Sequence, residues 1–317
     1  MLTVQKFGGS SLADAEKLRR AAETCLRERR RGRDVAVVVS AMGKTTDGLL
    51  ALAREISPTP PERELDALVS TGECSSAALL AITLESMSQR AISLTGWQSG
   101  IFTDSRHGGA EIISLTGSRV RSALAHGVVP VISGFQGVDG MGDVTTLGRG
   151  GSDTTAVALA AALRAESCDI FTDVDGIYTA DPRLVPTARR LTRVDLRDML
   201  TLSCAGAQVL CPRSVSLALE RAVDIRLAPA SGEGEGTRVC LLEPEERADF
   251  AGLALRGGEI TLAGPRAQES AAQLAGRLTQ NGIRPTALRL ADGAAVFDMQ
   301  PDVAIAAMRA LHSYVFE

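Results

Sequence analysis

The segment Asp34–Ser40 reads DVAVVVS, and this run of valines and alanine constrains the fold more than any other part of the chain. An unbroken apolar run of this length is typical of a strand buried on both faces of a parallel sheet. Val128–Ser133 and Cys168–Asp173 are predicted to be further buried strands. Helical patterns separate these runs, so βα units dominate the chain as far as about residue 230. This alternation predicts an α/β protein with a doubly wound, mainly parallel sheet.

The first predicted strand, Thr3–Lys6, ends in a glycine turn that reads FGGSS. A strand, a glycine turn and a helix start together form a cradle for phosphate, with Lys6 as a point charge beside it. Ser10 or Ser11 can cap the helix that follows. The lysine precedes the glycines, so the turn is not a P-loop. An ordinary strand-to-helix turn would have the same composition, and this alternative stays open.

Two further strand ends carry polar or glycine-rich turns. Ser40 is followed by AMGKTTD, which contains Lys44, Thr45 and Thr46, and the strand at 128–133 ends at GFQG, residues 134–137. Ligands of open α/β sheets bind at the carboxyl ends of the strands. These side chains are therefore placed where a site could use them, although the hydroxyl groups could equally cap the next helix.

The stretch Thr145–Leu163 reads TTLGRGGSDTTAVALAAAL, and its glycines frame a single arginine, Arg149. Glycines allow the backbone to approach a ligand closely, and the arginine offers a fork of donors suited to carboxylate or phosphate. Ser152 or Asp153 can cap the long helix that follows. The stretch predicts an anion site with an acid beside it. The alternative is a glycine-rich loop that leads into a core helix.

Composition and charge exclude several classes of protein. The formal net charge is −4 and aromatic residues make up only 3%, which argues against a nucleic-acid surface. The chain starts with a predicted strand instead of a signal region, and no apolar run appears long enough to cross a bilayer. The cysteines have neither metal spacing nor disulfide density. We therefore expect a cytoplasmic protein with no membrane association and no metal-binding residues.

A shift in composition, at Ser231–Gly236 and Glu243–Ala248, marks a predicted domain boundary. We expect a catalytic domain over residues 1–245 and a small α+β domain over 250–317. The second domain fits a ferredoxin-like βαββαβ pattern. Its predicted elements are strands at 259–263, 286–291, 294–299 and 314–316, with helices at 267–281 and 302–311.

Six motifs occur in an order that resembles aspartokinases, of the amino-acid kinase family. They are KFGGSSL, VVVSAMGKTTD, STGE, GFQG, TTLGRGGSDTTAVALAAAL and CDIFTDVDGIYTADPR, and the resemblance covers about residues 2–240. It implies a three-layer αβα fold and a phosphotransferase with a carboxyl group as acceptor. The implied reaction is ATP-dependent phosphorylation of the β-carboxylate of L-aspartate, the first step towards lysine, threonine and methionine. The implied cofactors are ATP and Mg²⁺, with the ion carried by the ATP phosphates.

The resemblance also implies roles for residues at matching positions. Lys6, Arg149 and Asp153 are the implied catalytic residues: Lys6 stabilises the transferring phosphoryl group, Arg149 holds the α-carboxylate of aspartate, and Asp153 organises Lys6. The implied aspartate pocket consists of Thr46, Glu73, Phe135, Arg149 and Ser152. The implied ATP-binding residues are Lys6, Gly8, Gly9, Ser10, Ser40, Thr172, Asp173, Tyr178, Asp181 and Arg183.

Two departures from the family pattern affect what we expect. Many aspartokinases have a lysine followed by VLHP where this chain has Gln208 followed by VLCP, so ATP affinity is expected to be weaker. Aspartokinases usually carry two ACT domains after the kinase, whereas only one ACT-like unit is predicted here. Its first strand–helix connection, AGPRAQES, lacks a glycine-rich turn, so altered or absent feedback inhibition is expected. The ACT-like unit is expected to mediate formation of a homodimer or higher homo-oligomer.

Two other functions compete with aspartate phosphorylation. A kinase of the same superfamily could act on glutamate, acetylglutamate, carbamate or a nucleotide, although STGE and TTLGRGGSDTTA argue against this. A catalytically silent, effector-binding regulatory subunit would explain the ACT-like tail and Gln208. However, a silent subunit has no need for Lys6, Arg149 and Asp153 together in one pocket. ATP turnover on aspartate distinguishes these functions.

Overall fold

The computed structural model describes residues 1–231 and 234–317. Residues 232 and 233, which belong to the predicted boundary stretch 231–236, lie outside the described residues. The chain divides into two compact units, Met1–Asp175 with Glu220–Glu235 and Gly176–Leu219 with Gly236–Glu317. Residues 176–219 group with the C-terminal residues, so the boundaries of these units differ from those of the expected domains, 1–245 and 250–317. The expected domain boundaries stay a prediction.

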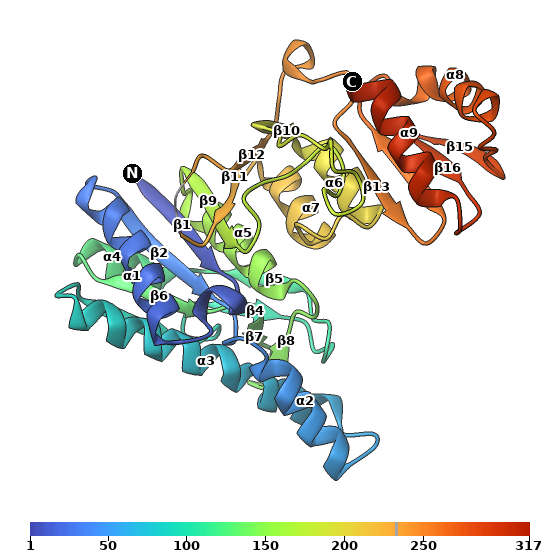
Figure 1. Cartoon of the computed structure of the whole chain (residues 1–317). Helices are drawn as coiled ribbons and strands as arrows, with labels where there is room; N and C mark the ends of the chain where they lie inside the picture. The colour runs from blue at the N-terminus through green and yellow to red at the C-terminus, as the bar shows by residue number, and fades with distance from the viewer. Residues whose placement is uncertain (232–233) are drawn as a thin grey trace. The chain divides into compact units, whose positions relative to one another are not determined.

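The first unit is built on a parallel sheet (Figure 1). Its strands lie in the order β11-β9-β1-β2-β6-β3, and each pairs in parallel with its neighbours. Their bounds are β1 Leu2–Phe7, β2 Asp34–Val39, β3 Ala91–Leu94, β6 Val129–Ser133, β9 Ser167–Thr172 and β11 Ile225–Pro229. The predicted parallel sheet is confirmed, and the three apolar runs of the sequence are β2, β6 and β9.

Helices cover both faces of this sheet. On one face, α1 (Ala15–Arg30) and α3 (Glu62–Ser86) pack with Phe7, Val37 and Phe171 in a continuous apolar core. Successive side chains of a strand point to opposite faces. Lys6, next to Phe7, accordingly points to the other face, where it meets Asp153 of α5 (Gly151–Leu163). This arrangement of helix, sheet and helix is the predicted three-layer fold.

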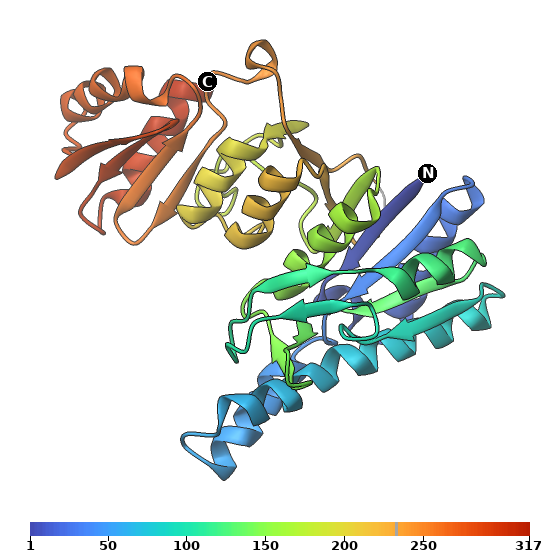
Figure 2. The ribbon, with the colours of Figure 1, turned by 180° about the vertical axis from the view of Figure 1, so that it is seen from behind.

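We expected no apolar run long enough to cross a bilayer, but the helix α3 is long and apolar enough to do so by length and composition alone. Half of its most apolar window is buried within the protein. The buried residues include the carboxylates Asp66 and Glu73. This burial is typical of the core helix of a soluble protein. The neighbouring α2 (Thr45–Ile56) is partly or fully exposed along its length, and it projects from the unit in both views (Figures 1 and 2).

A second, smaller sheet of the first unit has the strand order β5-β4-β7-β8. Its strands are β4 Ile101–Thr103, β5 Ile112–Leu115, β7 Gln136–Val138 and β8 Val144–Thr146. The hairpin of β7 and β8 connects the end of β6 to the glycine-rich stretch before α5. It therefore determines where that stretch begins. The remaining helix of this unit is α4, Ser118–Ala125.

Two expectations about helix caps are wrong. Asp14, not Ser10 or Ser11, caps α1, because its Oδ1 accepts a hydrogen bond from Lys17 N at 2.9 Å. The two serines lie in the short 3-10 helix η1, Gly9–Leu12. At α5 the N-cap position is Gly150, with a φ of 75°, and within the described part of the chain no side chain caps this end. Ser152 and Asp153 fall instead in the first turn of α5, where they line a cavity.

The second unit contains an antiparallel sheet with the strand order β13-β14-β16-β15. Its elements are β13 Gly252–Arg256, β14 Glu259–Ala263, α8 Ala267–Gln280, β15 Ala287–Ala291, β16 Ala294–Asp298 and α9 Ala304–Phe316. The unit also contains the parallel strands β10 (Arg193–Asp195) and β12 (Thr237–Cys240), with α6 (Leu196–Cys204) and the 3-10 helix η2 (Pro244–Glu246). The helix α7, Pro212–Arg221, begins in this unit.

The predicted βαββαβ order is partly wrong, because residues 314–316 form the last turn of α9 instead of a strand. Tyr314 and Phe316 pack against the apolar core from that helix. The missed strand is β13, which pairs with β14 through a turn at Gly257 and Gly258. It occupies the sheet edge beside β14 that the fourth strand of a ferredoxin-like fold would take. The predicted α+β unit with a four-stranded sheet and two helices is otherwise confirmed.

Candidate functional site

A cavity of about 260 Å³ lies at the carboxyl ends of the central strands of the first unit. It is formed by residues from several elements that are distant in sequence, including the end of β1, the turn after β2, α3 and the start of α5. The lining residues are Lys6, Gly9, Ser40, Ala41, Gly43, Thr46, Glu73, Phe135, Gly148, Arg149, Gly150, Gly151, Ser152 and Asp153. All the predicted catalytic residues and all the predicted aspartate-binding residues are among them.

Lys6 and Asp153 form an ion pair inside this cavity. The Nζ of Lys6 lies 2.6 Å from Oδ1 of Asp153, and the two side chains are only 11% and 14% exposed. A paired charge that is largely removed from water interacts strongly with a second charge brought beside it. The structure therefore holds the lysine ammonium at one place in the cavity wall, where an anionic group can approach it.

The glycine turn after β1 packs directly against the turn after β2. A Cβ atom on Gly9 would lie 2.4 Å from the carbonyl oxygen of Ala41, so only glycine fits here. The backbone N–H of Gly43 donates to Gly9 O at 2.9 Å, which ties the two turns together. The N–H of Gly8 donates to Phe171 O at 3.2 Å. Gly9 lines the cavity, whereas Gly8 and Ser10 lie outside its lining.

Glu73 is a buried carboxylate in the wall contributed by α3, and its residue is 4% exposed. Its Oε1 accepts a hydrogen bond from Ala41 N at 3.0 Å. Its Oε2 has no hydrogen-bond partner among residues 1–231 and 234–317. Burial raises the pKa of Glu73 to about 7, even though the hydrogen bond from Ala41 acts in the opposite direction. A buried carboxylate with one unpartnered oxygen is a strong site for a cationic group.

Phe135 lies in the GFQG turn with a φ of 71°, a left-handed conformation that is unusual for a residue with a side chain. The Oγ1 of Thr155 accepts from Phe135 N at 3.1 Å and donates to Gly151 O at 2.9 Å. One hydroxyl group thus joins the turn to the first turn of α5. Sequence reasoning missed this residue, although its position four residues after Gly151 places both on one face of the helix.

Substitution of Thr155 by valine is expected to reduce the free energy of unfolding by about 1–3 kcal/mol, because it leaves the N–H of Phe135 without its acceptor. Urea unfolding followed by circular dichroism measures this change. Thr155→Ser, which keeps the hydroxyl group, should lose much less stability. Thr154→Val is the matched control, since among the described residues the Thr154 hydroxyl donates only to the helix carbonyl of Gly150. Equal losses in the two valine variants would contradict this explanation.

Arg149 lies between two glycines with left-handed backbone, Gly148 and Gly150, whose φ values are 72° and 75°. This conformation is readily available to glycine and brings the loop to the mouth of the cavity. Arg149 is exposed there and lines the cavity together with Lys6. The cavity therefore offers two cationic side chains and one unpartnered carboxylate oxygen.

The predicted nucleotide-binding residues fall into separate groups. Ser40 lines the cavity, and Thr172 and Asp173 follow at the end of β9 in the first unit, where their side chains share a hydrogen bond of 2.9 Å. The other predicted residues, Tyr178, Asp181 and Arg183, belong to the second unit. Their combination into one nucleotide site stays a prediction.

Within the second unit, Asp181 accepts hydrogen bonds from the backbone and side chain of Arg183, the shortest at 2.7 Å. This arginine holds the pKa of Asp181 below its usual value. Gln208 is exposed between α6 and α7, and its predicted effect on ATP affinity is not tested by these contacts.

Comparison with known proteins gives consistent findings. Residues 1–228 match the sequence model of the amino acid kinase family. The chain is 53% identical over 239 residues to the aspartokinase of Mycolicibacterium smegmatis. The matched segment covers 75% of this chain and 57% of that protein. The chain is 50% identical over 238 residues to the aspartokinase of Geobacillus stearothermophilus, with 75% and 58% covered. The chain thus spans less than two thirds of the length of these curated relatives.

Two solved structures are similar over 99% of this chain. The first is E. coli aspartokinase III in complex with aspartate and ADP, with a TM-score of 0.74, 26% identity and 83% of that chain covered. The second is aspartate kinase from Synechocystis, with a TM-score of 0.70, 36% identity and 55% covered.

Proposed function

Because the chain belongs to the amino acid kinase family, we propose that it catalyses the ATP-dependent phosphorylation of the β-carboxylate of L-aspartate to aspartyl-4-phosphate. The observation that carries this proposal is one cavity that contains Lys6, Arg149 and the unpartnered oxygen of Glu73. L-Aspartate has two carboxylates and one ammonium group. Arg149 and Lys6 suit the carboxylates in sign and the Glu73 oxygen suits the ammonium group, while the fourth charged group of the lining, Asp153, is already paired with Lys6. The aspartokinases among the relatives support the same substrate.

In the proposed complex, each charged group of aspartate has a partner. Arg149 holds the α-carboxylate with its fork of donors. The Oε2 of Glu73 accepts a hydrogen bond from the α-ammonium group. This gives a partner to the oxygen that has none among the described residues. Thr46, Phe135 and Ser152 complete the pocket walls. The β-carboxylate is then left to face Lys6.

The proposed reaction needs no general base, because the attacking β-carboxylate is already an anionic nucleophile. One of its oxygens forms a bond to the γ-phosphorus of ATP, the bond from that phosphorus to the bridging oxygen of ADP breaks, and ADP leaves with the electron pair. Positioning and electrostatic stabilisation supply most of the catalysis in such transfers. The Nζ of Lys6 stabilises the charge on the transferring group, and Asp153 holds that Nζ in place.

We further propose that ATP is bound by residues of the first unit, namely Lys6, Gly8, Gly9, Ser10, Ser40, Thr172 and Asp173. The roles predicted for Tyr178, Asp181 and Arg183 stay predictions. Within the described ranges, no group of three or more histidine, cysteine, aspartate or glutamate side chains is arranged to hold a metal ion. Mg²⁺ is proposed to enter with the ATP phosphates, where it neutralises their charge. The protein is proposed to act in the cytoplasm as a homo-oligomer.

The proposal is tested by measuring ADP release from Mg-ATP with L-aspartate, with L-glutamate and without an acceptor. Hydroxylamine in a parallel reaction traps an acyl phosphate as a hydroxamate, which identifies the carboxylate as the acceptor. Aspartate-dependent ADP release with hydroxamate formation supports the proposal. Turnover with glutamate alone would assign another carboxylate, and ATP binding without turnover would indicate a silent regulatory subunit. Addition of lysine and threonine, singly and together, tests feedback inhibition.

A further inference from the structure

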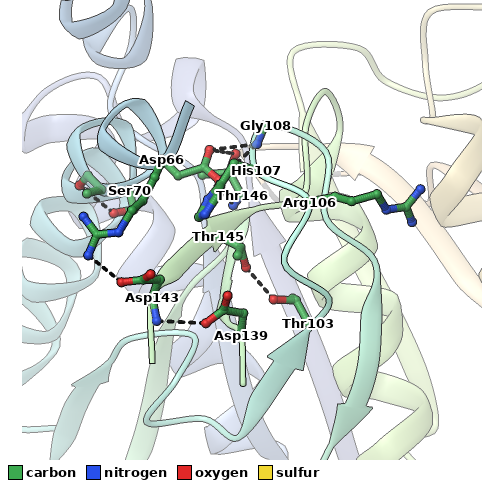
Figure 3. A network of polar contacts seen from close by, with 12 residues as sticks. Asp66, Ser70, Thr103, Arg106, His107, Gly108, Asp139, Asp143, Thr145 and Thr146 are labelled. Atoms are coloured by element: carbon green, nitrogen blue, oxygen red, sulfur yellow. Dashed lines mark hydrogen bonds and ion pairs between the residues drawn. The ribbon is translucent and has the colours of Figure 1, made fainter. Parts of the chain in front are cut away.

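Asp66, on α3, is a buried carboxylate that lies outside the cavity lining and is only 2% exposed. Figure 3 shows that it faces His107, Gly108 and Thr146, which come from two different chain segments. A carboxylate that accepts several hydrogen bonds in a dry environment holds its donors in a fixed geometry. Asp66 was not among the residues that the sequence indicated.

Two of these hydrogen bonds hold the end of β8. The Oδ2 of Asp66 accepts from Thr146 N at 3.0 Å, and its Oδ1 accepts from Thr146 Oγ1 at 2.5 Å. Thr146 is the last residue of β8, and Arg149 follows it three residues later. The carboxylate therefore holds the backbone immediately before the loop that carries Arg149.

The other hydrogen bonds hold the loop between β4 and β5. Gly108 N donates to both carboxylate oxygens at 3.0 and 3.1 Å, and His107 Nδ1 lies 2.9 Å from Oδ2. This loop packs on the arginine loop, since a Cβ on Gly148 would lie 3.0 Å from Gly108 O. Ala110 N also donates to Thr146 O at 2.8 Å. Asp66 thus holds both the strand that leads to Arg149 and the loop beside Gly148.

The same face of α3 supports two other parts of the cavity wall. The carbonyl of Ser70 accepts from Gln136 Nε2 at 2.9 Å, next to Phe135, and Glu73 accepts from Ala41 N at 3.0 Å. Residues 66, 70 and 73 lie on one side of a helix, because they are spaced by four and three positions. The Asp66 network is therefore continuous with the walls of the substrate cavity.

We propose that Asp66 is a positioning residue for Arg149 and thereby sets the affinity for the substrate carboxylate that this arginine binds. The inference rests on the proposed function for the identity of that substrate. Asp66 does not touch the substrate in this assignment; it acts through Thr146 and Gly108. A merely structural role would instead reduce the amount of folded protein without changing the affinity of the folded molecules for one substrate in particular.

The test compares Asp66→Ala, Thr146→Val and the control Asp143→Asn with the unaltered chain. Asp143 lies in the β7–β8 hairpin, as Thr146 does. Its carboxylate makes an exposed ion pair of 2.5 Å with Arg63, which lies one helical turn before Asp66 on α3. We expect Asp66→Ala to raise KM for aspartate by about ten- to a hundredfold, the range in which small misplacements of a binding group fall. KM for ATP should change less than about threefold, because Lys6 and Asp153 are held by other contacts. Asp143→Asn should match the unaltered chain.

A second readout does not depend on catalysis. Hydrogen–deuterium exchange of residues 147–151 should become faster in Asp66→Ala, while exchange in β9 should not change. Thr146→Val removes a single hydrogen bond and should shift KM for aspartate and the exchange rate in the same direction by a smaller factor. If Asp66→Ala does not fold, the same measurements on Thr146→Val test the inference.

Equal changes in both KM values, or unchanged KM for aspartate in folded variants, would overturn the inference. So would unchanged exchange at 147–151. A failure of the proposed function is distinguishable, because then the unaltered chain itself would not turn over aspartate. In that case the exchange measurement still decides whether Asp66 holds the Arg149 loop.

Discussion

Replacement of Lys6 by alanine is expected to lower kcat for aspartate-dependent ADP release at least about a hundredfold, as removal of one preorganised electrostatic donor does in other enzymes. The reason is the position of Nζ, which lies in the cavity wall 2.6 Å from Asp153. Removing the lysine takes away the cation that is proposed to face the transferring phosphoryl group and leaves the Asp153 carboxylate without its ion-pair partner. Steady-state kinetics with saturating Mg-ATP and aspartate measure the loss.

Lys17→Ala is the matched control, because Lys17 is a more exposed lysine on α1 whose Nζ lies 3.9 Å from Asp14. It should retain normal turnover. The double variant Lys6→Ala with Asp153→Asn tests the role of Asp153. If Asp153 acts only by organising Lys6, the double variant should be no slower than Lys6→Ala alone. Near-normal kcat in folded Lys6→Ala would refute the assigned role of the lysine.

Replacement of Glu73 by glutamine is expected to stabilise the protein above pH 7 while it weakens aspartate binding. Burial raises the pKa of this carboxyl from 4.5 to about 7, so the folded state favours the protonated form. The group consequently binds more protons in the folded than in the unfolded state between pH 4.5 and 7, and its ionisation lowers stability as pH rises through this window. Above pH 7 the full effect is about 3 kcal/mol. Glutamine keeps the acceptor for Ala41 N and avoids this penalty.

Thermal unfolding at pH 4.5 and pH 8.5 measures the expected gain in stability. Glu73→Gln should unfold at a higher temperature than the unaltered chain at pH 8.5, and the difference should be small at pH 4.5. Glu55→Gln, on the exposed surface of α2, should show no such dependence on pH. If Glu73→Gln gains nothing at pH 8.5, Glu73 is not an ionised, desolvated carboxylate in the folded protein.

The same substitution also separates stability from binding. Since Glu73 is proposed to accept from the α-ammonium group, KM for aspartate should rise strongly in Glu73→Gln above pH 7, and the difference from the unaltered chain should shrink as the pH falls below about 7. In the unaltered chain KM for aspartate should rise as pH falls below about 7, because protonation removes the anionic partner. An unchanged KM in the glutamine variant would assign the ammonium group to another residue.

Several parts of the fold could be predicted because their signals are local. The runs at 34–40 and 128–133 are almost entirely apolar, and the run at 168–173 has Ile170 and Phe171 at its centre. This pattern predicted strands buried on both faces of a sheet, and the runs are β2, β6 and β9. The caps were less predictable. Serines and aspartates suit several positions near a helix start, and the backbone conformation of Gly150 decided that neither Ser152 nor Asp153 caps α5.

The edge strand of the antiparallel sheet could not be predicted from the sequence, for a different reason. Residues 314–316 have a composition that suits a strand, but the edge position beside β14 is taken by β13. Which of two segments pairs with an edge depends on chain geometry and on the burial of distant side chains, and single-segment propensity does not contain this information. Tyr314 and Phe316 therefore pack, partly buried, against the core from a helix.

The sequence by itself determined the fold class through its alternating strand and helix patterns. It indicated the candidate site through Lys6, Arg149 and their neighbouring glycines, which stand in the motifs that resemble aspartokinases. Only the tertiary structure decided that Glu73 has one unpartnered oxygen and a raised pKa, and that Asp66 holds the loop of Arg149. Burial, hydrogen-bond partners and pKa arise from contacts between segments that are far apart in the chain. These contacts exist only after α3 has packed against the sheets.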